Sequence, residues 1–135
     1  MKGSSPARRQ PVKMHIELEI PYPVSVNAYY RALGNRSILS KRGREYKKHA
    51  KSLEHLRGTF TKDQRLKVTL NLYPPTRRVT DLDNLSKSAL DLLEDAGIFV
   101  NDSQIDQLVL KRREVTKGGK TVVNIRVIKE LERNE

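Results

Sequence analysis

Hydrophobic and polar residues alternate along two segments of the chain, 14–20 and 66–72, with the period of two that is typical of a half-buried β-strand. Two further runs rich in β-branched residues, 108–115 and 121–127, predict a third and a fourth strand. The residues between these two runs, 116–120, include two adjacent glycines and favour a hairpin that pairs them.

Two other segments have the period of an amphipathic helix. The first is capped by Ser40 and is predicted to end before Gly58. The second is predicted to end before Gly97, and its apolar residues form one stripe about 100° wide, as expected of a helix that faces a core. The apolar stripes consist of Tyr46, Ala50, Leu53 and Leu56 in the first helix, and of Leu82, Leu85, Ala89, Leu92, Leu93 and Ala96 in the second.

The order of these elements predicts an α+β fold, in which two helices pack on one face of a small mixed β-sheet. Residues 24–43 are expected to form a long surface loop with a short hairpin around Gly34 and Asn35. A chain of 135 residues has room for one domain, assigned to 14–135, and the polar, basic residues 1–13 are predicted to be a disordered arm.

The composition restricts the class of partner. A net charge of +11 favours a nucleic acid; the alternatives are a basic protein without such a partner and one that binds acidic proteins or membranes. Neither an apolar run of 18 residues nor a signal-like start is present, so we expect a cytoplasmic protein without a membrane partner. The chain has no cysteine, and its three histidines lack ligand spacing. Any metal would therefore be held by carboxylates, which favours Mg²⁺ or Mn²⁺ over Zn²⁺.

Acidic residues concentrate in segment 81–106, which contains seven of them and a single basic residue, Lys87. The segment has a net charge of −6 and the rest of the chain one of +17. Carboxylates repel a polyanion unless divalent cations lie between them. This distribution therefore favours a metal-dependent enzyme that acts on nucleic acid.

Two of these acids, Asp81 and Asp83, can face one ion only if the chain there is extended or turning, before the second helix begins. A structural alternative is a capping box with Thr80 as N-cap, or an ion pair between Asp83 and Lys87. A third acid, Asp102, must return along most of a helix of about 20 Å, or reach the site of a second subunit. The remaining acids are interpreted as solvated helix surface (Asp91, Glu94 and Asp95) or are assigned no role (Asp106).

Several motifs, taken in order, resemble the RusA family of Holliday-junction resolvases. The match extends from about residue 18 to about residue 128, and residues 1–13 lie outside it. The motifs are Pro21-x-Pro-x-Ser-x-Asn27-x-Tyr29-Tyr30-Arg31, Asp81-Leu-Asp83-Asn84-Leu85-x-Lys87, Gly97, Asn101-Asp102-x-Gln104 and Thr116-Lys-Gly-Gly119.

The resemblance implies an intertwined homodimer that resolves four-way DNA junctions by paired symmetric nicks in recombination and repair. It implies Mg²⁺ as the cofactor, with Mn²⁺ as a substitute and no small-molecule cofactor, in a bacterial or phage-encoded enzyme. Asp81, Asp83 and Asp102 would bind the metal, and Lys87, kept protonated by neighbouring acids, would assist at the scissile phosphate. Asn101 departs from the family pattern, which has an acid there. The alternatives are a DNA-architecture protein whose acids cap a helix, and a metal nuclease for flaps or RNA.

Basic residues outside the acidic segment are the expected phosphate contacts. Tyr29 and Tyr30 are predicted to pack their loop, with stacking on bases opened at the crossover as the alternative. The expected contacts are Arg77, Arg78, Lys111, Arg112, Arg113, Lys117 and Lys120, with Arg31, Arg36, Lys41 and Arg42 further along the DNA arms.

Overall fold

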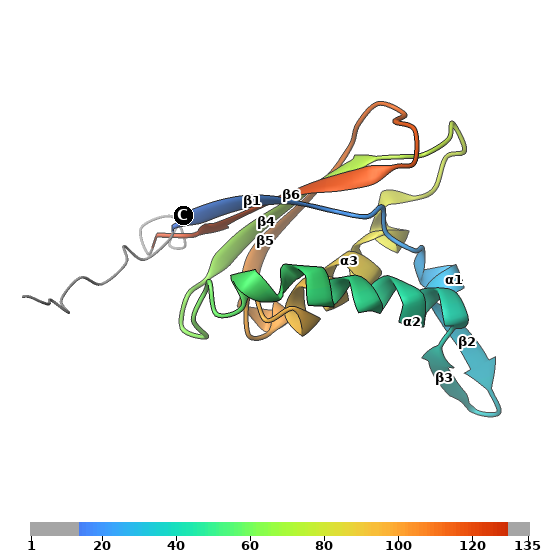
Figure 1. The fold of residues 1–135 in the computed structure, drawn as a ribbon, viewed down its shortest axis with the longest axis horizontal. Helices are drawn as coiled ribbons and strands as arrows, with labels where there is room; N and C mark the ends of the chain where they lie inside the picture. The colour runs from blue at the N-terminus through green and yellow to red at the C-terminus, as the bar shows by residue number, and fades with distance from the viewer. Residues whose placement is uncertain (1–13, 130–135) are drawn as a thin grey trace, which may run out of the picture.

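The computed structural model describes residues 14–129, which form one four-stranded β-sheet with helices on one face (Figure 1). The strand order is β1-β6-β4-β5; β4 and β5 are parallel, and the other neighbours are antiparallel. The predicted α+β fold with a small mixed sheet is confirmed. The predicted arm, 1–13, lies outside the described residues. The strands are β1 (His15–Ile20), β4 (Leu66–Tyr73), β5 (Ile105–Arg112) and β6 (Lys120–Val127).

The predicted hairpin between the last two strands is wrong, because β4 lies between β5 and β6. Leu70 of β4 is opposite Leu110 of β5 on one side and opposite Val123 of β6 on the other. The leucines and the valine of β4 that face the helices are fully buried, so this strand takes the centre of the sheet. Strand β5 also begins three residues earlier than predicted, at Ile105.

Helix α2 (Lys41–Lys47) begins after Ser40, whose hydroxyl oxygen accepts a hydrogen bond of 3.0 Å from the backbone N–H of Gly43. The chain continues as a 3₁₀ helix, η1 (Lys48–Leu56). Its apolar residues Ala50, Leu53 and Leu56 are spaced by three, so a helix with three residues per turn lines them up toward the core.

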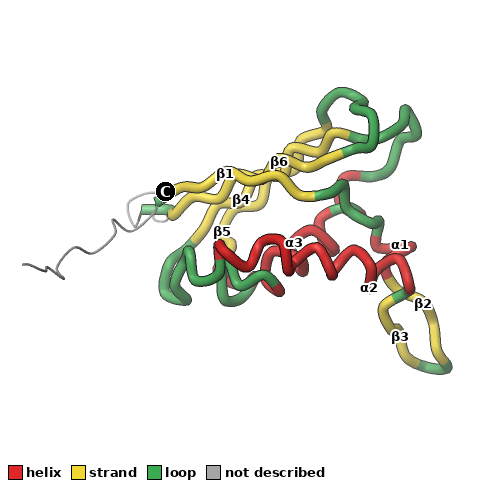
Figure 2. The backbone as a smooth tube through the Cα atoms, viewed as in Figure 1, coloured by secondary structure: helices red, strands yellow, loops and turns green. Residues whose placement is uncertain are grey.

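Helix α3 (Ser86–Asp95) lies beside α2 on the same face of the sheet (Figure 2). The apolar stripe predicted for it is buried, apart from Leu82, which is half-buried. Gly97 follows the helix with a φ of 76°, the left-handed conformation expected after a helix end. Within residues 14–129, none of the helices has the length and the apolar character needed to cross a bilayer.

The segment predicted as a surface loop contains a one-turn helix, α1 (Val26–Tyr29), which is too short for periodicity to reveal. The predicted hairpin around Gly34 and Asn35 is confirmed, with strands β2 (Tyr30–Leu33) and β3 (Arg36–Leu39). The prediction that Tyr29 packs its loop is confirmed, because its side chain is fully buried. Its packing requires Gly43, because a Cβ atom there would lie 2.5 Å from the carbonyl oxygen of Tyr29.

Candidate acidic site

Asp81 and Asp83 lie where the chain enters α3, before its first residue. Asp81 is extended (φ −60°, ψ 133°) and precedes a single 3₁₀ turn, η2 (Leu82–Asn84). In the described part of the chain no side chain caps this turn, so the alternative of a capping box at Thr80 is wrong. Both carboxylates are exposed, and neither makes a hydrogen bond or an ion pair with another residue of the described part. Their oxygens are therefore available to a ligand.

The loop that leads to Asp81 is held against the end of the sheet. Arg112 donates a hydrogen bond of 2.9 Å to the carbonyl oxygen of Thr80, and the backbone N–H of Thr116 donates one of 2.8 Å to Pro74. A pocket of about 610 Å³ opens beside Asp81. Its walls come from residues 22–28, from Arg42 and from residues 74–85. Arg42 and Arg78 are the basic residues among them.

Lys87 lies in the first turn of α3 and pairs with Asp91 one turn further on, at 3.2 Å between Nζ and Oδ1. The predicted pair of Asp83 with Lys87 is wrong, because the 3₁₀ turn places Asp83 outside the helix. The hydrogen bond to Asp91 raises the pKa of Lys87, and the charge of Asp102 adds to this effect. The prediction that neighbouring acids favour protonated Lys87 is therefore confirmed.

The interpretation as solvated helix surface holds for Asp95, which is exposed, but is wrong for Asp91 and Glu94, which are half-buried and bonded to other segments. Asp91 accepts a hydrogen bond of 3.1 Å from the hydroxyl of the buried Tyr29. Glu94 accepts one of 3.1 Å from the backbone N–H of Asp102, and Asp95 pairs with Lys47 at 3.1 Å. Helix periodicity shows which face points away from the core, but not which other segments lie against that face.

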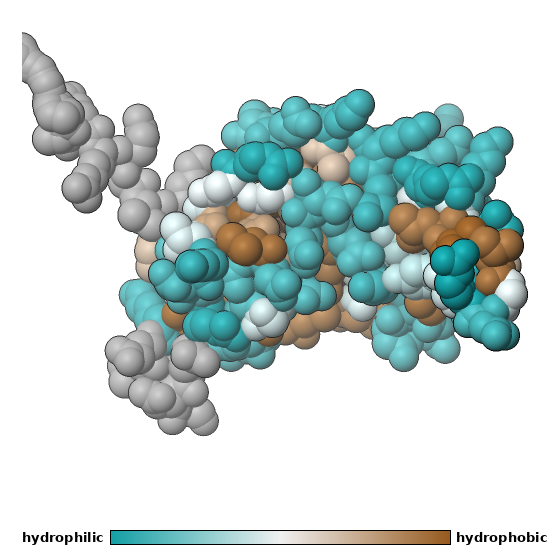
Figure 3. Space-filling model, turned by 90° about the horizontal axis from the view of Figure 1, so that it is seen from below, coloured by the Kyte–Doolittle hydropathy of each residue, from teal (hydrophilic) through white to brown (hydrophobic). Residues whose placement is uncertain are grey.

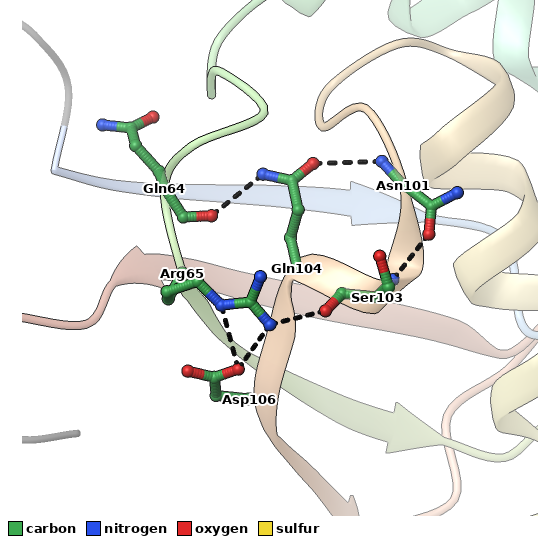
Figure 4. A network of polar contacts seen from close by, with 6 residues as sticks. All are labelled: Gln64, Arg65, Asn101, Ser103, Gln104 and Asp106. Atoms are coloured by element: carbon green, nitrogen blue, oxygen red, sulfur yellow. Dashed lines mark hydrogen bonds and ion pairs between the residues drawn. The ribbon is translucent and has the colours of Figure 1, made fainter. Parts of the chain in front are cut away.

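The turn that carries Asp102 is fastened by Gln104, a buried residue with 3% of its surface exposed (Figure 4). Its amide oxygen accepts hydrogen bonds from the backbone N–H groups of Val100 (2.8 Å) and Asn101 (3.0 Å). Its amide nitrogen donates to the carbonyl oxygens of Thr61 (2.7 Å) and Gln64 (2.9 Å). All four polar positions are satisfied, so Gln104 joins the Asp102 turn to the loop before β4.

Two further contacts hold the same turn. Asn101, the departure from the family pattern, caps η3 (Asp102–Gln104) by accepting a hydrogen bond of 2.8 Å from the backbone N–H of Ser103. Arg65 donates to the carbonyl oxygen of Ser103 at 2.6 Å and forms an ion pair of 2.7 Å with Asp106 (Figure 4). Asp106 thus helps to hold the turn through Arg65. The signal for this network was the Asn-x-x-Gln spacing, which is typical of a capping box.

The predicted metal ligands occupy two places. Asp81 and Asp83 lie at the entrance to α3, while Asp102 lies beside the helix, near enough to affect the pKa of Lys87. In the part of the chain that the structure describes, no three His, Cys, Asp or Glu residues form a group that could hold a metal. Mg²⁺ commonly takes only one or two carboxylates, together with waters and substrate phosphates. Asp81 and Asp83, whose carboxylates make no contact with another side chain within residues 14–129, fit that requirement.

One group of the predicted phosphate contacts gathers at one end of the sheet. Arg112 is opposite Leu72, and Lys120 is opposite Tyr73, whose ring lies 5.0 Å from the Lys120 Nζ. Arg113 donates hydrogen bonds to Asn71, so part of this group also has a structural task. The other members are Lys111 at the end of β5, Arg77 and Arg78 in the loop after β4, and Lys117 in the loop before β6.

A second group of predicted contacts lies on the hairpin and at the start of α2. Arg31 and Arg36 are exposed on β2 and β3, and Lys41 and Arg42 are exposed in the first turn of α2. The pocket beside Asp81, lined by Arg42 and Arg78, lies between the two groups. The acidic entrance to α3 thus adjoins basic residues of both groups.

Comparison with known proteins gives a consistent match. A family model described as endodeoxyribonuclease RusA matches residues 21–127. A crossover junction endodeoxyribonuclease RusA from Escherichia coli K12 is 32% identical over 109 residues, which cover 80% of this chain and 91% of that protein. Proteins of the same name from two Enterobacteria phages are also similar. The phage 82 protein is 31% identical over 111 residues (80% and 91%), and the phage HK97 protein is 32% identical over 107 residues (78% and 89%).

Proposed function

This chain belongs to the RusA family of endodeoxyribonucleases and is an endonuclease, and from that premise we propose that it resolves four-way DNA junctions by paired, symmetric, Mg²⁺-dependent nicks. The observation that carries the proposal is the pair of exposed carboxylates, Asp81 and Asp83, which have no partner among the described residues of an otherwise strongly basic chain. Recombination and repair are the processes that produce such a substrate. Similar proteins in a bacterium and in phages support a cytoplasmic location.

Asp81, Asp83 and Asp102 would be the residues that hold the ion, and Asp102 is also near enough to Lys87 to affect its pKa. When bound, Mg²⁺, or Mn²⁺ in its place, would neutralise the phosphate oxygens and make a bound water more acidic. To bind an ion, the exposed oxygens of Asp81 and Asp83 need not break a contact with any residue that the structure describes. Asp102 is held by its backbone, through Glu94, so its side chain is left for a ligand.

Lys87 would contact the phosphate as a fixed cation. Its raised pKa keeps it protonated at neutral pH, so it can stabilise the negative charge of the transition state but cannot act as a base. Asp91 and Tyr29 would not touch the substrate. They hold the ammonium group in place from the buried side. Preorganised charge of this kind needs no rearrangement during the reaction.

Two identical sites are needed for two symmetric nicks, so we propose that the enzyme acts as an intertwined homodimer. The basic groups at the end of the sheet and on the hairpin with α2 would contact the phosphates of the arms. The pocket beside Asp81 would take the backbone next to the cut, with Arg42 and Arg78 as its cations.

The test is a side-by-side digestion of a four-way junction, a duplex, a flapped duplex and an RNA of matched sequence, with Mg²⁺ and with EDTA. We expect paired nicks at symmetric positions, on the junction alone and only with Mg²⁺. Equal rates on flap or RNA would favour a different metal nuclease, and binding of the junction without cleavage would favour an architectural protein. A monomeric mass at micromolar concentration would contradict the dimer.

A further inference from the structure

The β2–β3 hairpin projects from the rest of the molecule (Figure 1). Among the described residues, its two strands pair only with each other. Tyr30 and Leu39 at its base pack against the core, whereas every residue from 31 to 37 is exposed. A two-stranded hairpin by itself is at best marginally stable in water. The exposed tip of the β2–β3 hairpin is therefore a candidate binding surface.

The register of the hairpin divides its residues between two faces. Arg31 is opposite Ile38, and Leu33 is opposite Arg36, so these four side chains share one face. Tyr30 lies on the other face, which is turned toward the core at the base of the hairpin. The outer face thus combines two arginines with two apolar residues. Leu33, next to the turn, has 45% of its surface exposed.

The charge of the hairpin indicates which class of partner it contacts. No acidic residue occurs between Glu19 and Glu45, while this stretch contains five basic residues, so the hairpin and the helix start beside it are uniformly positive. The hairpin of a second copy would bring the same positive charge to the contact, whereas DNA would bring phosphates. The hairpin end of the molecule shows an apolar area bordered by hydrophilic residues (Figure 3). This combination suits DNA that offers phosphates beside exposed base pairs.

The base of the hairpin adjoins the candidate site. The rings of Tyr30 and Tyr29 meet edge to face, with their centroids 5.0 Å apart. The hydroxyl of Tyr29 donates a hydrogen bond to Asp91, which in turn pairs with Lys87. A strand whose phosphate lies at Lys87 therefore passes near the start of the hairpin.

We infer that the β2–β3 hairpin is a wedge that enters the centre of a four-way junction, with Leu33 stacked on the base pair that the crossover leaves uncovered. Arg31 and Arg36 contact the phosphates on either side. Leucine is among the residues that proteins insert between base steps, and less stacking has to be broken at a crossover, where stacking is already interrupted. The inference rests on the proposed function and assigns a source to its selectivity, because a continuous duplex offers the wedge no uncovered base pair.

The experiment compares Leu33→Ser with Leu33→Met and with a control, Met14→Ser. Met14 is 46% exposed and directly precedes β1, a strand that lies away from the hairpin (Figure 1). Binding is measured in EDTA, so that no strand is cut, on a junction and on a duplex of the same sequence. A 2-aminopurine base beside the crossover reports unstacking by an increase in fluorescence.

We expect wild type, Leu33→Met and Met14→Ser to increase the fluorescence and to prefer junction over duplex equally. Leu33→Ser should lose the increase and reduce the preference at least tenfold, with duplex affinity unchanged within twofold. Wild-type fluorescence and preference in Leu33→Ser would overturn the inference, as would conversion of a dimer to a monomer by this substitution. Nicking of junctions by the wild type with Mg²⁺ tests the proposed function separately, since these comparisons use binding alone.

Discussion

The Nζ atom of Lys87 lies 3.2 Å from one oxygen of Asp91, and the second oxygen of that carboxylate accepts a hydrogen bond from the hydroxyl of Tyr29. Lys87 is exposed on α3, but Tyr29 is fully buried. An exposed ammonium group is thereby tied to the core through one carboxylate. Asp91 is a positioning residue on this account, and its removal should change the behaviour of Lys87 before it changes the fold.

Asp91→Asn should move the alkaline limb of the pH–rate profile to lower pH. The hydrogen bond to Asp91 raises the pKa of Lys87 above its ordinary 10.5, so the protonated form that activity requires is lost only above that pH. Without the carboxylate, the pKa falls and the loss begins earlier. We also expect about a tenfold lower kcat, because the ammonium group is less well placed. Asp95→Asn, which removes a partner of Lys47, is the control. An unshifted limb in Asp91→Asn would contradict this role.

Asp83→Asn should lower the rate of Mg²⁺-dependent cleavage at least a hundredfold and leave junction binding intact. The side chain has no protein partner in the described part of the chain, so the melting temperature should stay within about 2 °C of wild type. Asp63→Asn, another exposed aspartate, is the matched control. Cleavage at the wild-type rate by Asp83→Asn would show that the metal site lies elsewhere.

Gln104→Met should destabilise the fold by about 3 kcal/mol, because two backbone N–H groups and two carbonyl oxygens lose their partners in a buried place. Denaturant unfolding measures this change. The Mg²⁺ concentration for half-maximal cleavage should also rise several-fold, since Gln104 fastens the turn of Asp102. Asn71→Leu is the comparison, because Asn71 is a buried amide that bonds Val122 and Arg113. An equal rise of this Mg²⁺ concentration in both variants would show that Gln104 stabilises the fold as a whole and has no particular effect on the Asp102 turn.

Arg77→Gln and Arg78→Gln should each lower the salt dependence of junction binding. A phosphate contact releases counterions, so each loss should reduce the slope of log K against log salt by about 0.9. Lys51→Gln, an exposed residue of η1, should leave the slope unchanged. Titrations at several salt concentrations give the slope. Unchanged slopes in both arginine variants would place the phosphates elsewhere on the surface.

Gly43→Ala should destabilise the protein by about 1–3 kcal/mol, although alanine favours a helix more than glycine does. The new methyl group would lie 2.5 Å from the carbonyl oxygen of Tyr29 and 3.0 Å from its ring. Glu45→Ala, two residues further along the same helix and exposed, should change stability by less than about 0.5 kcal/mol. A Gly43→Ala variant as stable as wild type would mean that Tyr29 can shift without cost.

The parts of the fold that sequence periodicity reveals are those whose pattern is local. The apolar stripe of α3 and the alternation in β1 and β4 follow from residues a few positions apart, and both are confirmed. The pairing of β5 with β4 instead of β6 is a choice between distant partners. The pairing depends on how much apolar surface each strand buries, which a local turn motif does not report. The two glycines between β5 and β6 therefore predicted the wrong neighbour.

The site divides in the same way. The hypothesis that Asp81 and Asp83 share an ion predicted that they precede α3, because a carboxylate pair at i and i+2 cannot face one ion from within a helix, and they do precede it. The role of Asp91 could not, since its partner Tyr29 is 62 positions away and the segment around it has no clear periodicity. The motif Asn101-Asp102-x-Gln104 contains Gln104 but did not predict its hydrogen bonds to Thr61 and Gln64. Those bonds form only when the folded chain brings the loop before β4 beside the turn.

Every residue assigned to the chemistry, from Asp81 to Asp102, lies in the connection between β4 and β5, two parallel neighbours in the sheet. Parallel neighbours can pair only after the chain between them has been brought back, and ordering so long a connection makes this step slow compared with hairpin formation. In a refolding experiment, the last strand pairing and the recovery of nuclease activity should therefore follow one time course.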